Sequence, residues 1–542
     1  MLKINDNLIL FRDQKQLIAR ITDPVHKKDI QAVPGIQLMD STDGLYVQLP
    51  WCEHACQILN NIGIDATEAA PCMYHEYHPL VEGKYTPMKH QIFTAAFITL
   101  NPRAYILSDP RTGKTGALIL GTDYLRKNRS VIGGWLIITT VTTISSVWAS
   151  SIRASLPHAK VTIVHGKDRE KALNIPSDYY ITNYDSCRIS TKAFIHAVQE
   201  GRIGGVVIDE MTHIGNSSSK RHKAIDAFTN RLNMEHVIGI TGSPGENPET
   251  VYGMCRMINR SKLPCQTKTS WMNLVTFQYG PEPFMRKMTA QAPTIIHNAM
   301  QPAVRFRKGD ILDLPPITVQ DRTCNLSAEQ KRMREEFRAE AVALAQSGEV
   351  ITAANGGVLA QKLLQVAKGV CITNQGEVVS LEHKDRTSVI LEAIAETNRK
   401  VVVFETYKAV TRILTQEIRN AGYTCEFIDG SVTDKARAEI LYKFQNMPDP
   451  RVLVTNATCT AFGVELSAAD TMIYNGPVMS GGFVYAQSLE RLSSAKQTAS
   501  NINIIRIIAS PEEKKYFGML DKGQESGRMI AALFEDFASG IL

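Results

Sequence analysis

The chain has 542 residues, of which 44% are hydrophobic and 21% are charged. This composition excludes an intrinsically disordered chain and a fibrous one, and the length predicts about three or four domains or subdomains. With 60 Lys and Arg against 54 Asp and Glu, the formal net charge of +6 permits a polyanionic partner but does not indicate one.

The first residues of the chain and the distribution of its cysteines indicate the cellular compartment in which we expect the protein. The first residues carry charge and precede no apolar run, which is not typical of a secretory signal peptide, and the 10 cysteines are too scattered for a disulfide framework. Residues 131–148 form the most apolar stretch, but Gly133, Gly134 and several Thr and Ser interrupt it, so it favours a buried strand over a membrane span. We therefore expect an intracellular protein with no membrane role.

The beginning of the chain contains strand candidates at 8–11, 17–21 and 45–49, and a helical stretch follows at 51–62. This order predicts a small α+β domain over residues 1–80.

Cysteine and histidine residues gather around this helix. The spacing of Cys52, Cys56, Cys72 and His75 permits a tetrahedral Zn²⁺ site. The i,i+4 spacing of Cys52 and Cys56 also fits two buried residues of one helix, because free cysteine is often buried. Both interpretations stay open.

Beyond residue 85, short β-branched runs alternate with amphipathic helical stretches, which is typical of βαβ units around a parallel sheet. One series of strands is expected at 104–107, 136–139, 161–164, 206–208 and 237–240. A second series, which follows a pair of prolines, is expected at 401–404, 425–428, 452–454, 472–474 and 502–505. We therefore predict two α/β lobes, over residues 81–310 and 311–542.

Residues 108–115 read Ser-Asp-Pro-Arg-Thr-Gly-Lys-Thr and join a strand to an apolar helix, as a phosphate-binding loop does. Backbone amides at the start of a helix attract an anion, and Gly113 lets the loop approach it. Lys114 would reach the β- and γ-phosphates, and Thr115 would ligate Mg²⁺. Because Ser108 stands where the general pattern has a glycine, a turn with an exposed lysine is the alternative.

The strand at 206–208 ends in two acids, about one half-lobe after the phosphate loop. Asp209, at the carboxyl end of a buried strand, would hold Mg²⁺, and Glu210 would orient and deprotonate an attacking water. A solvated pair of acids at a strand end is the alternative.

Together these segments resemble the superfamily 2 helicases, and among them the Swi/Snf-like branch of ATP-driven double-stranded DNA translocases, over about residues 85–522. Gln91 resembles the glutamine with which the family reads adenine. Trp148 resembles a tryptophan that in the family precedes a strand ending in glycine. Thr241 and Ser243 resemble the motif that couples hydrolysis to lobe closure.

The second lobe carries further resemblances to this branch. Residues 314–316 and 326–330 resemble the transition into its second lobe, and Gly463 belongs to a segment similar to motif five, which also serves coupling. Gln487 and Arg491 resemble the start of motif six, which in the family supplies arginine to the γ-phosphate. For Arg491, an exposed helix charge is the alternative.

Three positions depart from the pattern of the branch. Arg111 stands where the phosphate loop usually has glycine, so it would either add a nucleotide contact or block the site. Thr212 replaces a histidine after the acid pair, and Ser494 replaces the second arginine of motif six, which would weaken the hydrolysis trigger.

The resemblance implies two RecA-like lobes that use ATP and Mg²⁺ to move along duplex DNA without sequence preference. A strand-separating superfamily 2 DNA or RNA helicase and a non-catalytic DNA-binding clamp are the alternatives. The first 80 residues resemble, at low specificity, the small substrate-recognition domain that precedes the motor in annealing helicases.

Overall fold

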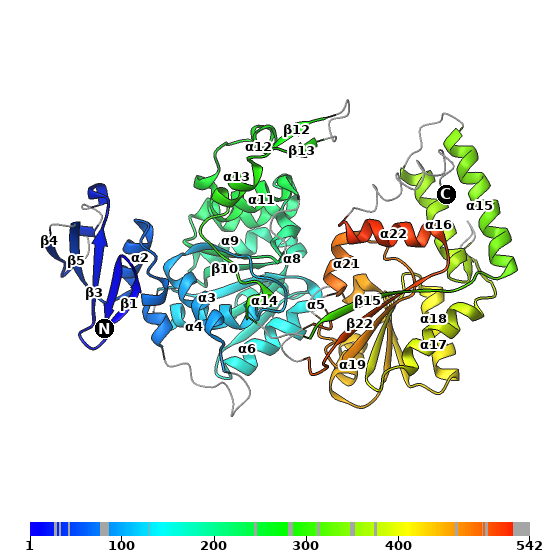
Figure 1. Cartoon of the computed structure of the whole chain (residues 1–542). Coiled ribbons are helices and arrows are strands. Elements are labelled where there is room, and N and C mark those ends of the chain that lie inside the picture. Colours follow the sequence, from blue (N-terminus) through cyan, green and yellow to red (C-terminus); the bar gives the residue numbers. More distant parts are fainter. Residues whose placement is uncertain are drawn as a thin grey trace. The chain divides into compact units, whose positions relative to one another are not determined.

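The computed structural model of the chain describes residues 1–26, 30–31, 34–41, 44–75, 86–128, 130–242, 247–279, 286–311, 315–346, 353–372, 377–460, 464–489, 491–493 and 497–523. The chain divides into two compact units, Met1–Ile311 and Leu312–Leu542 (Figure 1). None of the helices in this described part is long and apolar enough to span a bilayer.

The first unit opens with a small α+β domain. Its main elements are β1 (Leu2–Asn5), β2 (Leu8–Phe11), β3 (Gln16–Ile21), β4 (Gln37–Ser41), β5 (Gly44–Pro50) and α2 (Glu53–Asn61). The strands form an antiparallel sheet in the order β1-β2-β3-β5-β4. Along β3, Leu17, Ala19 and Ile21 are buried and alternate with less buried residues, so one face of the sheet covers the core.

The cysteines around α2 are core residues. The thiol of Cys56 donates to a backbone carbonyl at 3.6 Å, and burial raises its pKa. Cys72 is buried, and the ring of His75 packs edge-on against Tyr124 at 5.3 Å. The described residues, which include Cys52, contain no group of three or more His, Cys, Asp or Glu that could hold a metal ion. The zinc interpretation is therefore wrong, and the helix-core interpretation accounts for the i,i+4 spacing.

The core of this domain continues into the first lobe. Ala95 and Leu100 of α3 (Lys89–Leu100) and Leu120 of α4 (Lys114–Lys127) belong to the same hydrophobic cluster as the sheet. The predicted border at residue 80 falls outside the described residues, and the division into three domains stays a prediction.

A parallel sheet forms the centre of the first lobe. Its strands are β6 (Arg103–Ile106), β7 (Gly134–Thr139), β8 (Val161–Val164), β9 (Tyr179–Asn183), β10 (Ile203–Asp209), β11 (His236–Ile240) and β14 (Ala303–Val304). Their order is β14-β6-β11-β10-β7-β9-β8, and β6, β7, β10 and β11 are completely or almost completely buried, as strands covered by helices on both faces require.

Helices surround this sheet. They are α5 (Val141–Thr143), the π-helix η4 (Ile144–Ala149), α6 (Ser150–Ser155), α7 (Arg169–Leu173), α8 (Tyr184–Ile189), α9 (Thr191–Gln199), α10 (Lys220–Phe228), α11 (Pro248–Ile258), α12 (Lys268–Val275), α13 (Ala292–Ala299) and α14 (Lys308–Ile311). Between α12 and α13 the chain adds a hairpin of β12 (Thr276–Gln278) and β13 (Arg286–Met288).

The second lobe has its own parallel sheet, in the order β15-β22-β21-β18-β20-β19. These strands are β15 (Ile317–Thr323), β18 (Lys400–Phe404), β19 (Cys425–Ile428), β20 (Val452–Thr455), β21 (Ala469–Tyr474) and β22 (Ile502–Ile508). The remaining elements are α15 (Ala328–Gln346), α16 (Ala353–Ala367), β16 (Val370–Ile372), β17 (Val378–Ser380), α17 (Lys384–Ala395), α18 (Lys408–Asn420), α19 (Asp434–Asn446), α20 (Ala457–Thr460), α21 (Gly482–Leu489) and α22 (Pro511–Asp521).

The predicted fold, two α/β parallel-sheet lobes preceded by a small α+β domain, is confirmed. Each expected strand of both series coincides with an observed strand, within a few residues at its ends. The apolar stretch at 131–148 is not a membrane span: it contains β7 and most of the π-helix η4.

A buried ion pair organises the end of β18 in the second lobe. Lys368 and Glu405 are each about 2% exposed, and their charged atoms lie 3.1 Å apart. Burial lowers the pKa of the Lys368 amine. Glu405 Oε1 also accepts from the N–H groups of Thr406 at 2.6 Å and Tyr407 at 2.7 Å, so the pair fixes the loop that follows the strand.

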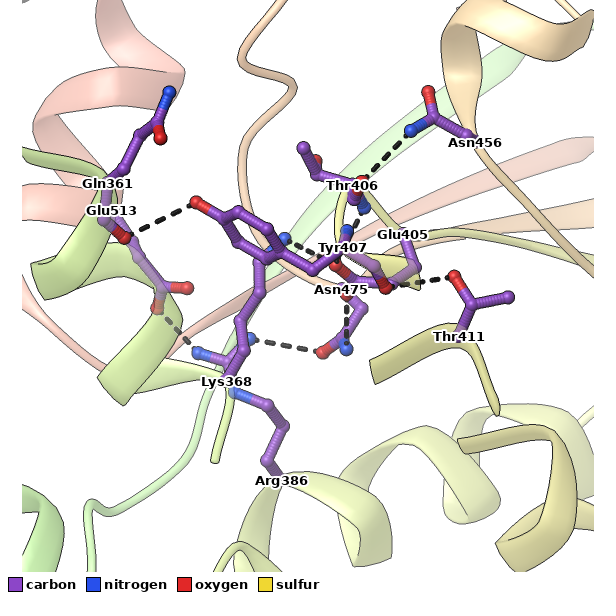
Figure 2. Close-up of polar contacts among 10 residues, drawn as sticks. All are labelled: Gln361, Lys368, Arg386, Glu405, Thr406, Tyr407, Thr411, Asn456, Asn475 and Glu513. Carbon is purple, nitrogen blue, oxygen red and sulfur yellow. Dashed lines mark hydrogen bonds and ion pairs between the residues drawn. The ribbon is translucent and has the colours of Figure 1, made fainter. Parts of the chain in front are cut away.

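A second buried pair joins this network (Figure 2). Arg386 Nη2 donates to Glu513 Oε2 at 2.6 Å, and Arg386 Nη1 donates to Asn475 Oδ1 at 3.1 Å. Asn475 in turn donates to Glu405 Oε2 at 2.8 Å. Asn475 follows β21, so the network ties the loops at the ends of two neighbouring strands together.

We predict that Lys368→Met destabilises the second unit by about 3–5 kcal/mol, because it leaves the Glu405 carboxylate buried without its partner. The double variant Lys368→Met/Glu405→Gln should recover part of this loss. Lys384→Met removes a lysine whose side chain is 87% exposed and should change stability by about 0.5 kcal/mol or less. Urea unfolding of the full chain measures these changes, and equal stability of Lys368→Met and Lys384→Met would contradict the prediction.

Candidate functional site

The phosphate loop, the coupling motif and the acid pair follow neighbouring strands. In the order β6-β11-β10, the register aligns Ile106 with Ile240 and Ile240 with Asp209. Because the strands are parallel, the loops that follow them leave the sheet at the same edge. All three predicted motifs of the first lobe therefore lie at its carboxyl edge.

The phosphate loop contains two residues with a left-handed backbone. Gly113, just before α4, has φ of 76°, and a Cβ there would lie 2.2 Å from Gln91 Nε2, so a larger residue would strain the backbone and displace the Gln91 side chain. Buried Gln91 donates from Nε2 to Gly113 O at 3.0 Å and accepts at Oε1 from Met88 N at 2.9 Å. Arg111 has φ of 67°, which is uncommon for a residue other than glycine. Each amide atom of Gln91 retains one more hydrogen-bonding position, and its contact with adenine stays a prediction.

The ammonium group of Lys114 bonds to the loop itself. Its Nζ donates to the carbonyl oxygens of Ser108 at 2.8 Å and Asp109 at 2.7 Å. Ser108 Oγ accepts from Phe306 N at 3.0 Å, so the serine that replaces glycine ties the loop to the segment after β14. Thr115 follows Lys114 in the first turn of α4, where unpaired backbone N–H groups attract an anion.

The coupling motif packs against this loop. Thr241 is buried, and its N–H donates to Ile106 O at 3.1 Å. A Cβ on Gly242 would lie 3.0 Å from Pro110 Cδ, which places the motif beside the phosphate loop. Ser243 lies outside the described residues.

Two side chains orient the first acid. Asp209 Oδ2 accepts from Thr139 Oγ1 at 2.9 Å and from Trp148 Nε1 at 2.8 Å. Thr139 ends β7, the neighbour of β10, and Trp148 lies in the π-helix η4, an irregularity that is frequent at functional sites. The family resemblance pointed to Trp148 but did not predict that it bonds to Asp209. Thr139 was not predicted as a site residue, although it ends the strand beside the acids.

Tyr184 supports both acids through their backbone. Its hydroxyl donates to Asp209 O and, at 3.2 Å, to Glu210 O, and burial raises its pKa well above the usual value, so the hydroxyl keeps its proton. Glu210 has φ of 56°, a left-handed conformation that costs a residue with a Cβ about 1–3 kcal/mol. The acid pair is therefore held in one conformation by its surroundings.

Thr212, where the resemblance leads us to expect a histidine, is followed by His213. The ring of His213 lies 5.2 Å from the ring of Tyr184, and burial lowers its pKa, so the imidazole is neutral at pH 7. This position was not predicted from the sequence.

The acid pair fits a hard divalent cation. Thr139 and Trp148 both bond to Oδ2 of Asp209, and Oδ1 accepts no hydrogen bond from any residue that the structure describes. Carboxylate and hydroxyl oxygens suit Mg²⁺, which binds few protein ligands because it keeps water and phosphate oxygens. Asp209 and Thr115 are thus the residues that would hold it.

In the second lobe, Arg491 is buried against Gln487. Its Nε donates to Gln487 O at 2.9 Å and its Nη2 to Gln487 Oε1 at 2.8 Å, and both residues are about 5% exposed. The alternative of an exposed helix charge is therefore wrong. The action of Arg491 and Gln487 on a nucleotide stays a prediction, and Gly463 and Ser494 lie outside the described residues.

Two protein families match the chain. The SNF2-related domain matches residues 67–372, and the helicase conserved C-terminal domain matches residues 385–496.

Relatives agree with this match at low identity. An uncharacterized ATP-dependent helicase of Mycoplasma genitalium is 21% identical over 404 residues, which are 73% of this chain and 37% of that protein. The DNA annealing helicase and endonuclease ZRANB3 of Homo sapiens is 22% identical over 445 residues, 79% of this chain and 39% of that protein. The DNA repair and recombination protein RAD54-like of Danio rerio is 20% identical over 346 residues, 57% of this chain and 45% of that protein. The chain thus spans less than half the length of these relatives.

A solved structure is also similar: the SWI2/SNF2 ATPase core of Sulfolobus solfataricus in complex with dsDNA aligns with 85% of this chain and 95% of that one, at 20% identity and a TM-score of 0.39. Because the SNF2-related domain alone matches more than half of the residues, the chain belongs to the SNF2-related family.

Proposed function

We propose that the chain is a motor that uses ATP to move along double-stranded DNA without sequence preference. The observation that carries the proposal is the alignment of the phosphate loop, the coupling motif and the acid pair on three adjacent parallel strands. Two relatives are named for work on DNA, one as an annealing helicase and one as a repair and recombination protein. These names support DNA as the partner.

In the proposed first half of the site, the chain binds the nucleotide. Gln91 contacts adenine, and Lys114 exchanges its bonds to the loop carbonyls for phosphate oxygens. Gly113 brings the backbone close to the phosphates, and Arg111 adds a contact from the same loop. When bound at Thr115 and Asp209, Mg²⁺ supplies charge neutralisation of the phosphates.

In the proposed second half of the site, the chain promotes ATP hydrolysis and couples hydrolysis to lobe closure. Glu210 orients a water and removes its proton, and the hydrogen bond from Tyr184 to the Glu210 carbonyl oxygen helps to hold its left-handed backbone. Arg491, held by Gln487, is the second lobe's contribution to charge stabilisation. The coupling role belongs to Thr241, which packs beside the phosphate loop, together with Ser243 and Gly463.

We predict that Trp148→Phe raises the Mg²⁺ concentration needed for half-maximal ATP hydrolysis about tenfold, because Asp209 loses a donor that orients its carboxylate. Titration of turnover with Mg²⁺ measures this shift. Trp135→Phe is the control, since Trp135 is fully buried in the same lobe and its indole N–H has no partner among the described residues. The same Mg²⁺ dependence in both variants would refute the orienting role.

Displacement of the third strand from a triplex tests movement along a duplex. We expect the chain to displace this strand with ATP but not without it, and to leave a forked duplex of equal length paired, because translocation on a duplex needs no strand separation. Efficient unwinding of the fork, or stimulation of turnover by RNA alone, would favour the strand-separating alternative. DNA binding without any ATP turnover would indicate the clamp.

A further inference from the structure

The hairpin of β12 and β13 follows α12, which packs against α11. Trp271 of α12 donates from its indole N–H to Pro248 O at 2.7 Å, and Lys268 pairs with Glu249 at 2.6 Å. Both bonds attach α12 to the first turn of α11, the helix that follows the carboxyl end of β11. The chain continues directly from α12 into the hairpin (Figure 1).

One face of the hairpin carries two exposed aromatic rings and a lysine. Phe277 is 49% exposed and lies directly opposite Lys287 in the strand register. Tyr279, two residues further, is 56% exposed, and Lys287 Nζ lies 4.6 Å from the centre of its ring. Because Lys287 lies opposite Phe277 in the register and contacts the ring of Tyr279, the two rings and the cation form one surface, which we call the hairpin platform.

The opposite strand is fastened to α12. Arg286 Nε donates to Thr276 Oγ1 at 2.7 Å, and its Nη2 donates to Asn273 Oδ1 at 2.8 Å. Thr289 N donates to Val275 O at 3.0 Å, which closes the base of the hairpin. A platform held in this way loses little conformational freedom when a ligand covers its rings.

The described part of the hairpin carries a net positive charge. The described hairpin residues, 276–279 and 286–288, contain two basic residues, Arg286 and Lys287, and no acid. This local excess of positive charge favours a polyanionic partner, and the net charge of the whole chain did not disclose it.

We propose that the hairpin platform binds an unpaired nucleotide of a DNA strand, with the base stacked on Phe277 or Tyr279 and the phosphate next to Lys287. This inference rests on the proposed function for the choice of DNA, and it adds a contact with single-stranded DNA to a motor that moves on duplexes. Exposed aromatic rings stack on bases without sequence preference, and a neighbouring cation tracks the backbone. Inside a duplex, the faces of each base are covered by the neighbouring base pairs, so a side-chain ring can stack only on a base that is unpaired.

Equilibrium binding of fluorescently labelled single-stranded DNA tests the platform, with a blunt duplex of the same length as the second probe. The double variant Phe277→Ala/Tyr279→Ala should bind the single strand about tenfold more weakly and the duplex nearly as well as the unchanged chain, given the usual contribution of a stacked base. Phe277→Trp keeps a stacking ring and should retain the affinity. Tyr442→Ala removes a ring that is 60% exposed on α19 and should change neither affinity.

Salt dependence provides a second and independent measurement. Lys287→Ala removes one phosphate contact, so the slope of log affinity for the single strand against log salt should fall by about 0.7. Lys287→Ala leaves both aromatic rings in place. This measurement is therefore informative even if the double variant does not fold.

Equal single-strand affinities of the unchanged chain and the double variant, or an unchanged salt slope in Lys287→Ala, would overturn the platform while leaving triplex displacement intact. Failure of triplex displacement in the unchanged chain would instead overturn the proposed function and leave the affinity comparison valid. Loss of self-association in the double variant, with unchanged DNA binding, would also overturn the proposal and assign the rings to a protein contact.

Discussion

The register of three parallel strands is the constraint on which the catalytic half of the molecule depends. β6, β11 and β10 end at the same level, so the loops that follow them meet although residues 106 and 209 are more than 100 positions apart in sequence. Shifting any of these strands by one residue would turn each of its side chains to the other face of the sheet, so these largely buried strands fix the register strongly. The placement of Lys114, Thr241 and Asp209 is thus a consequence of the core.

Hydrogen bonds and ion pairs of buried polar groups then hold the side chains and loops at the ends of these strands. In the first lobe, Thr139 and Trp148 hold the carboxylate of Asp209, and Gln91 holds the phosphate loop. In the second lobe, Lys368 and Glu405 hold the loop after β18. Removing one partner would leave a buried polar or charged group unsatisfied, which costs more than the bond itself contributes.

Much of this was predictable from sequence, because β-branched runs and a Gly-Lys-Thr loop are local signals. The strands and the motifs at Lys114 and Asp209 follow from such signals. Contacts between distant segments were not predictable from sequence. The hydrogen bond of Trp148 to Asp209 depends on the direction in which the π-helix η4 orients the indole of Trp148. The sequence also left open whether Arg491 is exposed, and the structure shows it buried against Gln487. The zinc hypothesis failed for the same reason, since spacing alone does not show whether cysteines converge.

Steady-state ATP turnover and ATP binding of Lys114→Ala and Glu210→Gln, measured with blunt duplex DNA, test the central claim most directly. The account predicts that DNA stimulates the unchanged chain and that both variants lose turnover. Only Lys114→Ala should lose most of its ATP affinity, because Lys114 contacts phosphates in the ground state whereas Glu210 acts on the water. Equal turnover in all three proteins would contradict the assignment of this edge of the first lobe as the site of hydrolysis.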